Sequence, residues 1–145
     1  GGSAGGYAVL NGLVHSKVFA AGANYYGVAE LIMLAEDTHD FESRYLDSLI
    51  GPYPEQKELY IERSPLTHAD NLTSPLIIFQ GSDDPIVPPS QSQAFRDACI
   101  KNGVKYKYFE FEGESHGFRK SQTITTCAIE ELKFFGEVLG FVPAD

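Results

Sequence analysis

The feature of this sequence that most constrains its fold is a continuous run of apolar residues in the second half. Leu76-Ile77-Ile78-Phe79-Gln80 lies between Pro75 and Gly81, two residue types that interrupt regular structure. A strand with one face in water alternates apolar and polar residues, whereas a strand covered on both faces is apolar along its length. The run therefore predicts a buried strand in a sheet that has other layers packed on both sides.

Apolar spacing and turn residues predict further strands and helices around this run. The predicted strands are residues 18–21, 76–80 and 104–111. The predicted helices are 5–13, 28 to about 49, 55–61, a helix from Pro88 to Gly103, and 121–139 with an apolar stripe of Ile124, Ala128, Leu132, Phe135 and Leu139. Residues 64–75 are predicted to be irregular. This order is typical of α/β proteins with parallel crossovers, and we expect residues 1–145 to lie in one domain.

Composition argues against several kinds of partner. The 145 residues are 43% hydrophobic and 21% charged, as in ordinary globular proteins. With 11 basic and 20 acidic residues the formal net charge is −9, so the long-range field repels nucleic-acid phosphates and anionic lipid. The apolar runs are far shorter than the roughly 20 residues that cross a bilayer. We therefore expect neither nucleic acid nor a membrane as a partner.

The two cysteines, Cys99 and Cys127, lie far apart without a CxxC pair or a neighbouring histidine pair. Neither a zinc site nor a disulfide framework is suggested by this spacing. Two unpaired thiols favour a reducing compartment, and we expect a cytoplasmic location. The sequence opens on Gly1-Gly2-Ser3 without an initiator Met or a signal-peptide pattern, so its N-terminus is expected to be a cut one.

The first motif that carries chemistry is Gly1-Gly2-Ser3-Ala4-Gly5, which satisfies G-x-S-x-G. In that pattern a tight strand-to-helix turn lifts the serine hydroxyl above a sheet. The N–H of Ala4 then lies at a helix N-terminus, where it can bind an oxyanion. A chance cluster of small residues and a phosphate-binding glycine turn are the alternatives for this motif alone.

Two more motifs follow predicted strands. Gly81 to Pro88 places Asp83 and Asp84 directly after the buried strand, at the sheet edge where ligands of α/β proteins gather. Gly113 to Phe118 places His116 between glycines after the next strand. Taken singly, each motif also fits an alternative without catalytic function. The first fits a turn with solvated acids, and the second fits a surface histidine.

Together the three motifs occur in the order Ser, Asp, His of α/β hydrolases. Ser3 is a weak nucleophile by itself, and His116 is suited to take and return its proton near neutral pH. An acid from the Asp83-Asp84 pair would orient the imidazole. The implied reaction is acyl transfer to water, which needs no metal or organic cofactor.

At these residues the sequence resembles the C-terminal part of the catalytic domain of prolyl oligopeptidase-family serine peptidases, in the acylaminoacyl-peptidase and dipeptidyl-peptidase-like branch. The resemblance rests on spaced segments in the same order: residues 1–7, 41–46, 62–65, 81–88 and 113–118. It implies an α/β-hydrolase fold and a peptide substrate. Position by position, it implies that Ser3 is the nucleophile, His116 the general base and Asp84 the orienting acid, with Asp83 as the second choice.

The same resemblance implies weaker assignments and several absent parts. Tyr25, Tyr26 and Val87 would lie near the pocket for the side chain that precedes the scissile bond, with ordinary packing as the alternative. Family members carry upstream strands of the hydrolase sheet, a β-propeller and a second oxyanion donor. None of these occurs here, so we expect a fragment of a longer enzyme, whose open edge would favour association into homo-oligomers or aggregation.

Three function classes remain open from the sequence. The first is a serine peptidase acting on short peptides; the second is a carboxylesterase or thioesterase-like hydrolase with the same motifs; the third is a truncated, non-catalytic module. His15, His39 and His68 fit surface histidines because none forms a metal-binding pair. Glu110, Glu112 and Glu114, which lead into His116, fit either a wet strand face or a source of charge for the imidazole.

Overall fold

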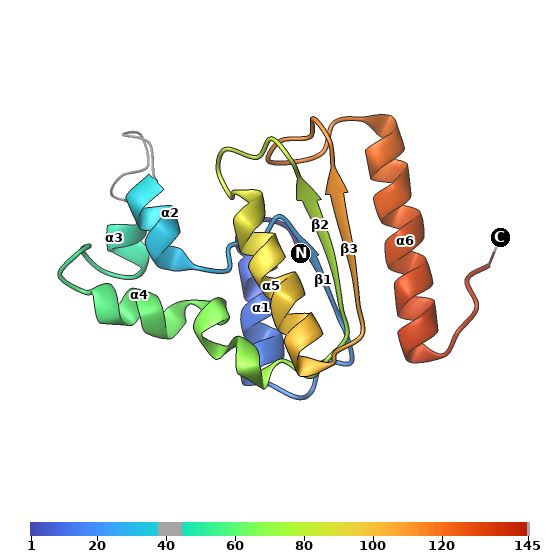
Figure 1. The fold of residues 1–145 in the computed structure, drawn as a ribbon, viewed down its shortest axis with the longest axis horizontal. Helices are drawn as coiled ribbons and strands as arrows, with labels where there is room; N and C mark the ends of the chain where they lie inside the picture. The colour runs from blue at the N-terminus through green and yellow to red at the C-terminus, as the bar shows by residue number, and fades with distance from the viewer. Residues whose placement is uncertain (38–44, 145) are drawn as a thin grey trace.

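The computed structural model describes residues 1–37 and 45–144, and its centre is a parallel sheet of three strands (Figure 1). The strands are β1 (Gly22–Tyr25), β2 (Leu76–Gly81) and β3 (Tyr106–Phe111), in the order β1-β2-β3. Leu76 pairs with Gly22 on one side and with Tyr106 on the other. The carboxyl ends of the strands therefore meet at one edge, and the expected α/β class is confirmed.

Strand β2 is buried along its whole length, as its sequence predicts. Its side chains alternate between two cores: Leu76 and Ile78 face one, and Ile77 and Phe79 the other. Helices α1 (Ala4–His15) and α5 (Pro89–Asn102) contribute to the first core, and α6 (Ser121–Leu139) to the second (Figure 1). The helices predicted at 5–13, from Pro88 to Gly103 and at 121–139 are thereby confirmed, with the second one running from Pro89 to Asn102.

The first strand begins at Gly22 and not at Val18 as predicted. Val18 is 83% exposed, and the ring of Phe19 lies beside Gly12 of α1. Strand β1 begins with two small residues, Gly22 and Ala23, because α1 packs directly on it: a Cβ at Gly22 would stand 2.7 Å from Cδ1 of Leu13. Hydrophobicity alone selected the wrong residues, since close helix–strand packing favours the smaller ones that follow.

Between β1 and β2 the chain makes a helical excursion. It contains α2 (Leu31–Asp37), α3 (Tyr45–Leu49), α4 (Lys57–Arg63) and a 3-10 helix, η1 (Pro65–Asn71). The predicted long helix starts at Leu31 instead of Val28. The Glu30 carboxylate accepts the N–H groups of Ile32 and Met33 and so caps the N-terminus of the helix at this point. Residues 38–44, which include His39 and Phe41–Arg44 of the family-like segment, lie outside the described residues. The helix predicted at 55–61 is found at 57–63, and the predicted irregular stretch contains η1.

A third apolar cluster connects this excursion to the loop after β2. Its buried members are Val28, Leu31, Leu46, Tyr60 and Val87. In Figure 1 helices α2 to α4 lie together on one side of the sheet. Val87 thus links them to the loop that carries Asp84.

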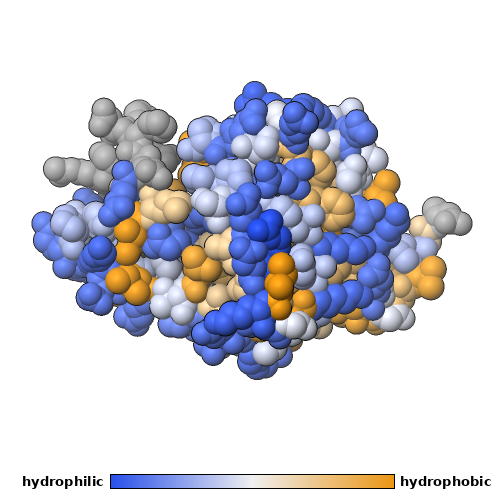
Figure 2. Space-filling view, viewed as in Figure 1, coloured by the Kyte–Doolittle hydropathy of each residue, from blue (hydrophilic) through white to orange (hydrophobic). Residues whose placement is uncertain are grey.

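The apolar stripe predicted for α6 faces the sheet only in part: Phe135 packs against the second core, but most of the stripe does not. Ile124, Leu132 and Leu139 are exposed, whereas Cys127 and Phe134 are buried against β2. Two adjoining sides of this helix are apolar, so spacing alone does not identify the buried one. Figure 2 shows one exposed apolar patch near the C-terminal end of the chain, where Leu139, Phe141 and Val142 are exposed. None of the described helices has the length and apolarity to span a membrane.

Candidate active site

Ser3 occupies a strained turn at the start of α1. Its φ of 52° and ψ of −116° lie in a region that residues with a side chain rarely adopt. Gly2 forms a parallel bridge with Tyr25, and a Cβ at Gly1 would stand 2.5 Å from the carbonyl oxygen of Gly5. The backbone thus enters beside β1, turns at Ser3 and continues as a helix, as G-x-S-x-G predicts.

Ala4 is the first residue of α1. The first N–H groups of a helix have no acceptor within the helix, and they lie at the positive end of its dipole. The N–H of Ala4 directly follows the strained serine. Its position suits the stabilisation of a negative charge that develops beside the Ser3 hydroxyl.

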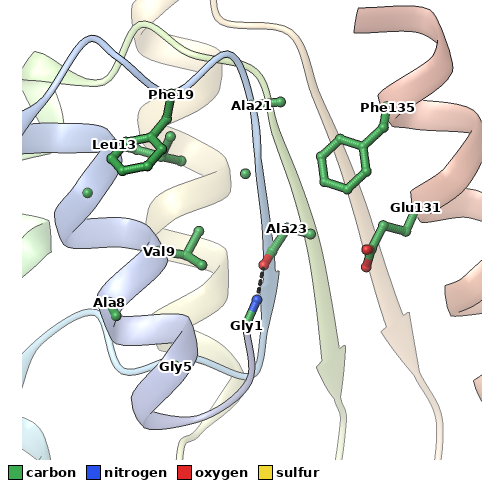
Figure 3. Close-up of a pocket in the computed structure, with 12 residues that line it drawn as sticks. Gly1, Gly5, Ala8, Val9, Leu13, Phe19, Ala21, Ala23, Glu131 and Phe135 are labelled. Carbon is green, nitrogen blue, oxygen red and sulfur yellow. Dashed lines mark hydrogen bonds between the residues drawn. The ribbon is translucent and has the colours of Figure 1, made fainter. Parts of the chain in front are cut away.

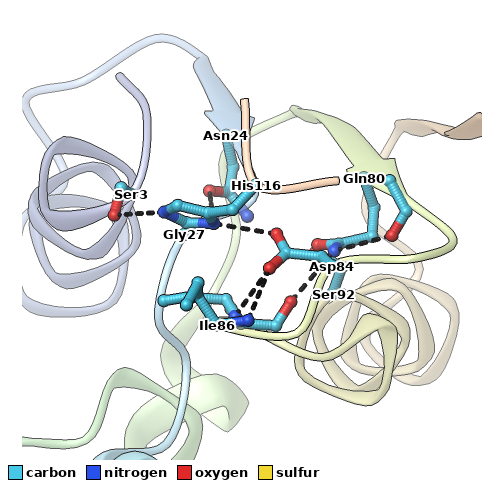
Figure 4. A network of polar contacts seen from close by, with 10 residues as sticks. Ser3, Asn24, Gly27, Gln80, Asp84, Ile86, Ser92 and His116 are labelled. Carbon is cyan, nitrogen blue, oxygen red and sulfur yellow. Dashed lines mark hydrogen bonds and ion pairs between the residues drawn. The ribbon is translucent and has the colours of Figure 1, made fainter. Parts of the chain in front are cut away.

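The structure brings Ser3, His116 and Asp84 together in one hydrogen-bonded chain (Figure 4). The His116 Nδ1 lies 2.8 Å from Asp84 Oδ2, and its Nε2 lies 2.9 Å from Ser3 Oγ. A carboxylate only accepts hydrogen bonds, so Nδ1 donates to it and Nε2 of the neutral ring accepts the Ser3 hydroxyl. The three residues come from the start of α1 and from the loops after β2 and β3.

Asp84, and not Asp83, faces the imidazole. The Asp84 side chain has no exposed surface, and its second oxygen accepts the N–H groups of Ile86 and Val87 at 2.9 Å each. Asp83 is exposed, and its carboxylate accepts the hydroxyl of Ser82. The motif alone left the acid open and the family resemblance favoured Asp84; the turn points this second acid toward the sheet edge and leaves Asp83 in solvent.

The loop that carries His116 is closed by a buried carboxylate. Glu114 is 2% exposed and accepts the N–H groups of Arg119 and Lys120 at 2.9 Å each, just before α6 begins. These backbone hydrogen bonds hold the pKa of Glu114 below its ordinary value. The carbonyl of Glu114 also accepts the N–H of Asp83 at 3.0 Å, which joins the two loops. The wet-face interpretation of this acid is wrong, because the loop folds back over it.

Gln80 is a further residue of this region that sequence reasoning missed. It is fully buried at the end of β2, where its amide nitrogen donates to the carbonyls of Gly81 and Val87 at 3.1 Å each. The hydroxyl of Ser92 in α5 donates to its amide oxygen at 2.7 Å (Figure 4). The available signal was a polar residue closing an otherwise apolar strand.

The two tyrosines predicted near the substrate pocket have different polar surroundings, although their ring centroids lie 6.3 Å apart and both rings contact Phe118. The ring of Tyr26 lies 5.0 Å from that of His116 at an interplanar angle of 62°, and its backbone has a left-handed φ of 40°. Burial raises the pKa of Tyr26, so its hydroxyl stays protonated. Tyr25 instead packs on Phe79 and donates its hydroxyl to Glu131 of α6. Only Tyr26 of the pair is brought beside the imidazole.

Val87 is 1% exposed and packs within the third apolar cluster. Its N–H donates to Asp84. The residue predicted for the substrate pocket therefore lies next to the acid, at the junction with the helical excursion.

A cavity of about 400 Å³ lies away from this hydrogen-bonded chain, between α1, β1 and α6 (Figure 3). Its walls are mainly small or apolar, with Glu131 and Phe135 on the α6 side. The carbonyl of Gly1 accepts the N–H of Tyr25, and the Tyr25 carbonyl accepts the N–H of Ser3, both at 3.0 Å. The N-terminal amine of Gly1 also donates to the carbonyl of Ala23 at 2.8 Å (Figure 3), so residues 1–3 pair with β1 from Ala23 to Tyr25. The cavity lies along the beginning of that edge, at Ala21 to Ala23.

The remaining site predictions concern histidines and metals. His15 is exposed and His68 is half-buried, with ring centroids 4.6 Å apart. Within residues 1–37 and 45–144, no three His, Cys, Asp or Glu side chains are grouped closely enough to hold a metal ion. Cys99 and Cys127 are free and buried, and burial raises the pKa of each thiol to about 12.

Comparison with known proteins agrees with this geometry. The family model of the prolyl oligopeptidase family matches residues 1–141. The chain is 33% identical to dipeptidyl aminopeptidase BIII of Pseudoxanthomonas mexicana over 97% of this chain and 21% of that protein.

Solved structures show the same likeness. A puromycin-hydrolyzing peptidase of Mycobacterium tuberculosis is 48% identical with a TM-score of 0.95, covering 100% of this chain and 22% of that one. An acylaminoacyl peptidase of Pyrococcus horikoshii is 25% identical with a TM-score of 0.84, covering 99% and 24%. The likeness confirms the α/β-hydrolase fold class, and the chain spans between 21% and 24% of the length of these relatives.

Proposed function

Because this chain belongs to the prolyl oligopeptidase family, we propose that it carries the catalytic triad of a serine peptidase that hydrolyses peptide bonds of short peptides. The observation that carries this proposal is the hydrogen-bonded chain from Ser3 through His116 to Asp84, at 2.9 and 2.8 Å. A nucleophile, a base and an acid within hydrogen-bond distance are what acyl transfer requires.

In the first half of the proposed reaction, Ser3 Oγ attacks the carbonyl carbon of the scissile bond. His116 Nε2 takes the hydroxyl proton, and Asp84 stabilises the imidazolium without taking a proton itself. The carbonyl oxygen becomes an oxyanion that the N–H of Ala4 stabilises. When the carbon–nitrogen bond breaks, the imidazolium gives its proton to the leaving amine, and the acyl group stays on Ser3.

In the second half, water replaces the amine. His116 takes a proton from the water as its oxygen attacks the acyl carbon, and then returns that proton to Ser3 Oγ when the ester bond breaks. The acid product leaves and the starting state is restored. The side chains, the backbone dipoles and the attacking water supply every proton and charge in this cycle, so we propose that no cofactor takes part.

The substrates that we propose are those of acylaminoacyl- or dipeptidyl-peptidase-like enzymes. The relatives named for dipeptides, acylaminoacyl groups and puromycin support this class. We place Tyr26 and Val87 near the substrate, because Tyr26 contacts His116 and Val87 is bonded to Asp84. Tyr25 stands as the weaker assignment, since its hydroxyl is engaged by Glu131.

We propose that residues 1–145 form the C-terminal part of one catalytic domain within a longer polypeptide. Its upstream strands would continue the parallel pairing of Gly2 with Tyr25 and fill the cavity beside β1. The lengths of the relatives support further parts, which the family resemblance identifies as the rest of the sheet and a β-propeller. Association into homo-oligomers and a cytoplasmic location also belong to the proposal, with gel filtration and cell fractionation as their tests.

The test uses the full-length protein and a fluorophosphonate probe, followed by intact mass. We expect one adduct on the wild type and none on Ser3→Ala, with Ser121→Ala, a change at an exposed serine at the start of α6, labelled like the wild type. An adduct that persists in Ser3→Ala contradicts the proposal. Hydrolysis of dipeptidyl anilides, acylaminoacyl anilides and puromycin then identifies the substrate class.

A carboxylesterase or thioesterase uses the same triad, so the leaving group must distinguish it from a peptidase. We expect kcat/KM for a peptide anilide to exceed that for a short acyl ester with the same acyl part, corrected for the greater intrinsic reactivity of the ester. Turnover of esters alone would assign the chain to the esterase class. Absence of both activities and of labelling would assign it to a non-catalytic module.

A further inference from the structure

The turn that presents Asp84 is held at both ends by one buried amide. Gln80 Nε2 donates to the carbonyl of Gly81, where the turn begins, and to that of Val87, where it ends. Gln80 has no exposed surface, so water does not compete for these bonds. The amide oxygen in turn accepts the Ser92 hydroxyl, which ties the clamp to α5.

Val87 shows how the clamp reaches the acid. Its carbonyl is held by Gln80, and its N–H donates to Asp84 Oδ1. Both the N–H and the carbonyl of Val87 are therefore held in place. The other carboxylate oxygen of Asp84 is directed at His116 Nδ1. A shift of this turn would lengthen the bond to the imidazole without touching Ser3.

We propose that Gln80, supported by Ser92, is a positioning residue for the hydrolysis reaction: it acts through the turn to keep Asp84 within hydrogen-bond distance of His116. The inference rests on the proposed function and adds a residue to it. Gln80 touches neither Ser3 nor His116 in any of the hydrogen bonds described. Its effect on the reaction must therefore pass through Asp84.

The test is a double-mutant cycle in the full-length protein with Gln80→Met and Asp84→Asn. Methionine preserves the volume and removes all three hydrogen bonds, while asparagine preserves a turn acceptor and removes the charge. With Asp84 present, we expect Gln80→Met to lower kcat by about 10- to 100-fold, because the catalytic group is displaced. We expect KM to change less than about 2-fold. On the Asp84→Asn background, the further loss is expected to stay below about 2-fold.

Gln91→Met is the matched control. Gln91 is also a buried glutamine, 2% exposed, but its amide holds the backbone of Ala29 and Glu30 and not the Asp84 turn. We expect Gln91→Met to change kcat by the same factor on the wild-type and on the Asp84→Asn background, because no shared partner couples the two sites.

Thermal unfolding of each variant shows whether it is folded at the assay temperature. If Gln80→Met does not fold, Ser92→Ala carries the test, with an expected loss of about 5-fold in kcat that also disappears on the Asp84→Asn background. Equal losses on both backgrounds, or a loss confined to KM, would overturn the inference. A wild-type protein without hydrolysis or Ser3 labelling refutes the proposed function instead, so the two failures are distinguishable.

Discussion

Gly81 and Glu114 bring the loop of Asp84 and the loop of His116 into direct backbone contact. A Cβ at Gly81 would overlap the carbonyl oxygen of Glu114 and stand 2.7 Å from that of Ser115. The N–H of Asp83 donates to the same Glu114 carbonyl at 3.0 Å. The absence of a side chain at Gly81 is therefore what permits Asp84 and His116 to approach each other.

Gly81→Ala tests this contact. Backbone atoms cannot rotate away from the new methyl group, so we expect the free energy of unfolding to fall by about 1–3 kcal/mol and kcat to fall as His116 is displaced. Urea unfolding and steady-state kinetics measure the two effects. Ser115→Ala, an exposed change in the same loop, is expected to behave like the wild type. A Gly81→Ala protein with wild-type kcat would show that the loops do not need this close approach.

Removal of the nucleophile or the base is expected to abolish turnover. Ser3→Ala and His116→Ala should each lower kcat by roughly a million-fold, and the double variant should be no worse than either single one, because the residues act as one unit. Circular dichroism and thermal unfolding check that the fold is intact. Substantial hydrolysis by either single variant would refute the proposed roles.

The two neighbouring acids are expected to differ sharply. Asp84→Asn should lower kcat by about 10,000-fold, because the amide no longer holds the productive imidazole tautomer. Asp83→Asn should change kcat less than about 3-fold, since Asp83 is exposed and bonded to Ser82. Measurement of kcat for both variants under the same conditions distinguishes the two acids. Similar losses in both would contradict the assignment of the acid to Asp84.

Glu114 predicts a pH dependence of stability. Its folded-state pKa is lowered from 4.5 by the hydrogen bonds to Arg119 and Lys120. Its contribution is therefore fully present above pH 4.5 and is lost as the pH falls from there through the folded-state pKa. We expect Glu114→Gln to be less stable than the wild type near neutral pH, with the difference shrinking in acid. Urea unfolding across this range measures it, and a difference that is constant with pH would rule out the carboxylate as its source.

Tyr26 is expected to act through its ring. Tyr26→Phe keeps the contact with His116 and should retain kcat within about 2-fold, whereas Tyr26→Leu should lose about 3- to 10-fold, the value of an aromatic pair. Because burial raises the pKa of Tyr26, the Phe variant should show the same pH–rate profile as the wild type. A larger loss in Tyr26→Phe would mean that the hydroxyl takes part in the reaction.

Short-range patterns were enough to predict several parts of this protein. The apolar run at 76–80 identified the central strand, because a strand with cores on both faces has no polar alternation. The three loop motifs singled out Ser3, His116 and an acid, which the structure places within hydrogen-bond distance, because turns and sheet edges place such residues at predictable points. These features depend on neighbours in the sequence, and the sequence therefore determined them.

Other features depended on neighbours in space. The choice of Asp84 over Asp83, the start of β1 at Gly22 and the buried side of α6 follow from contacts among segments far apart in the chain. The same is true of Gln80 and Glu114. Their hydrogen-bond partners lie in segments that are brought together only by the folded loops. A residue pattern records which side chains are apolar or chemically capable, but burial and hydrogen-bond partners arise only when the helices and loops pack around the sheet.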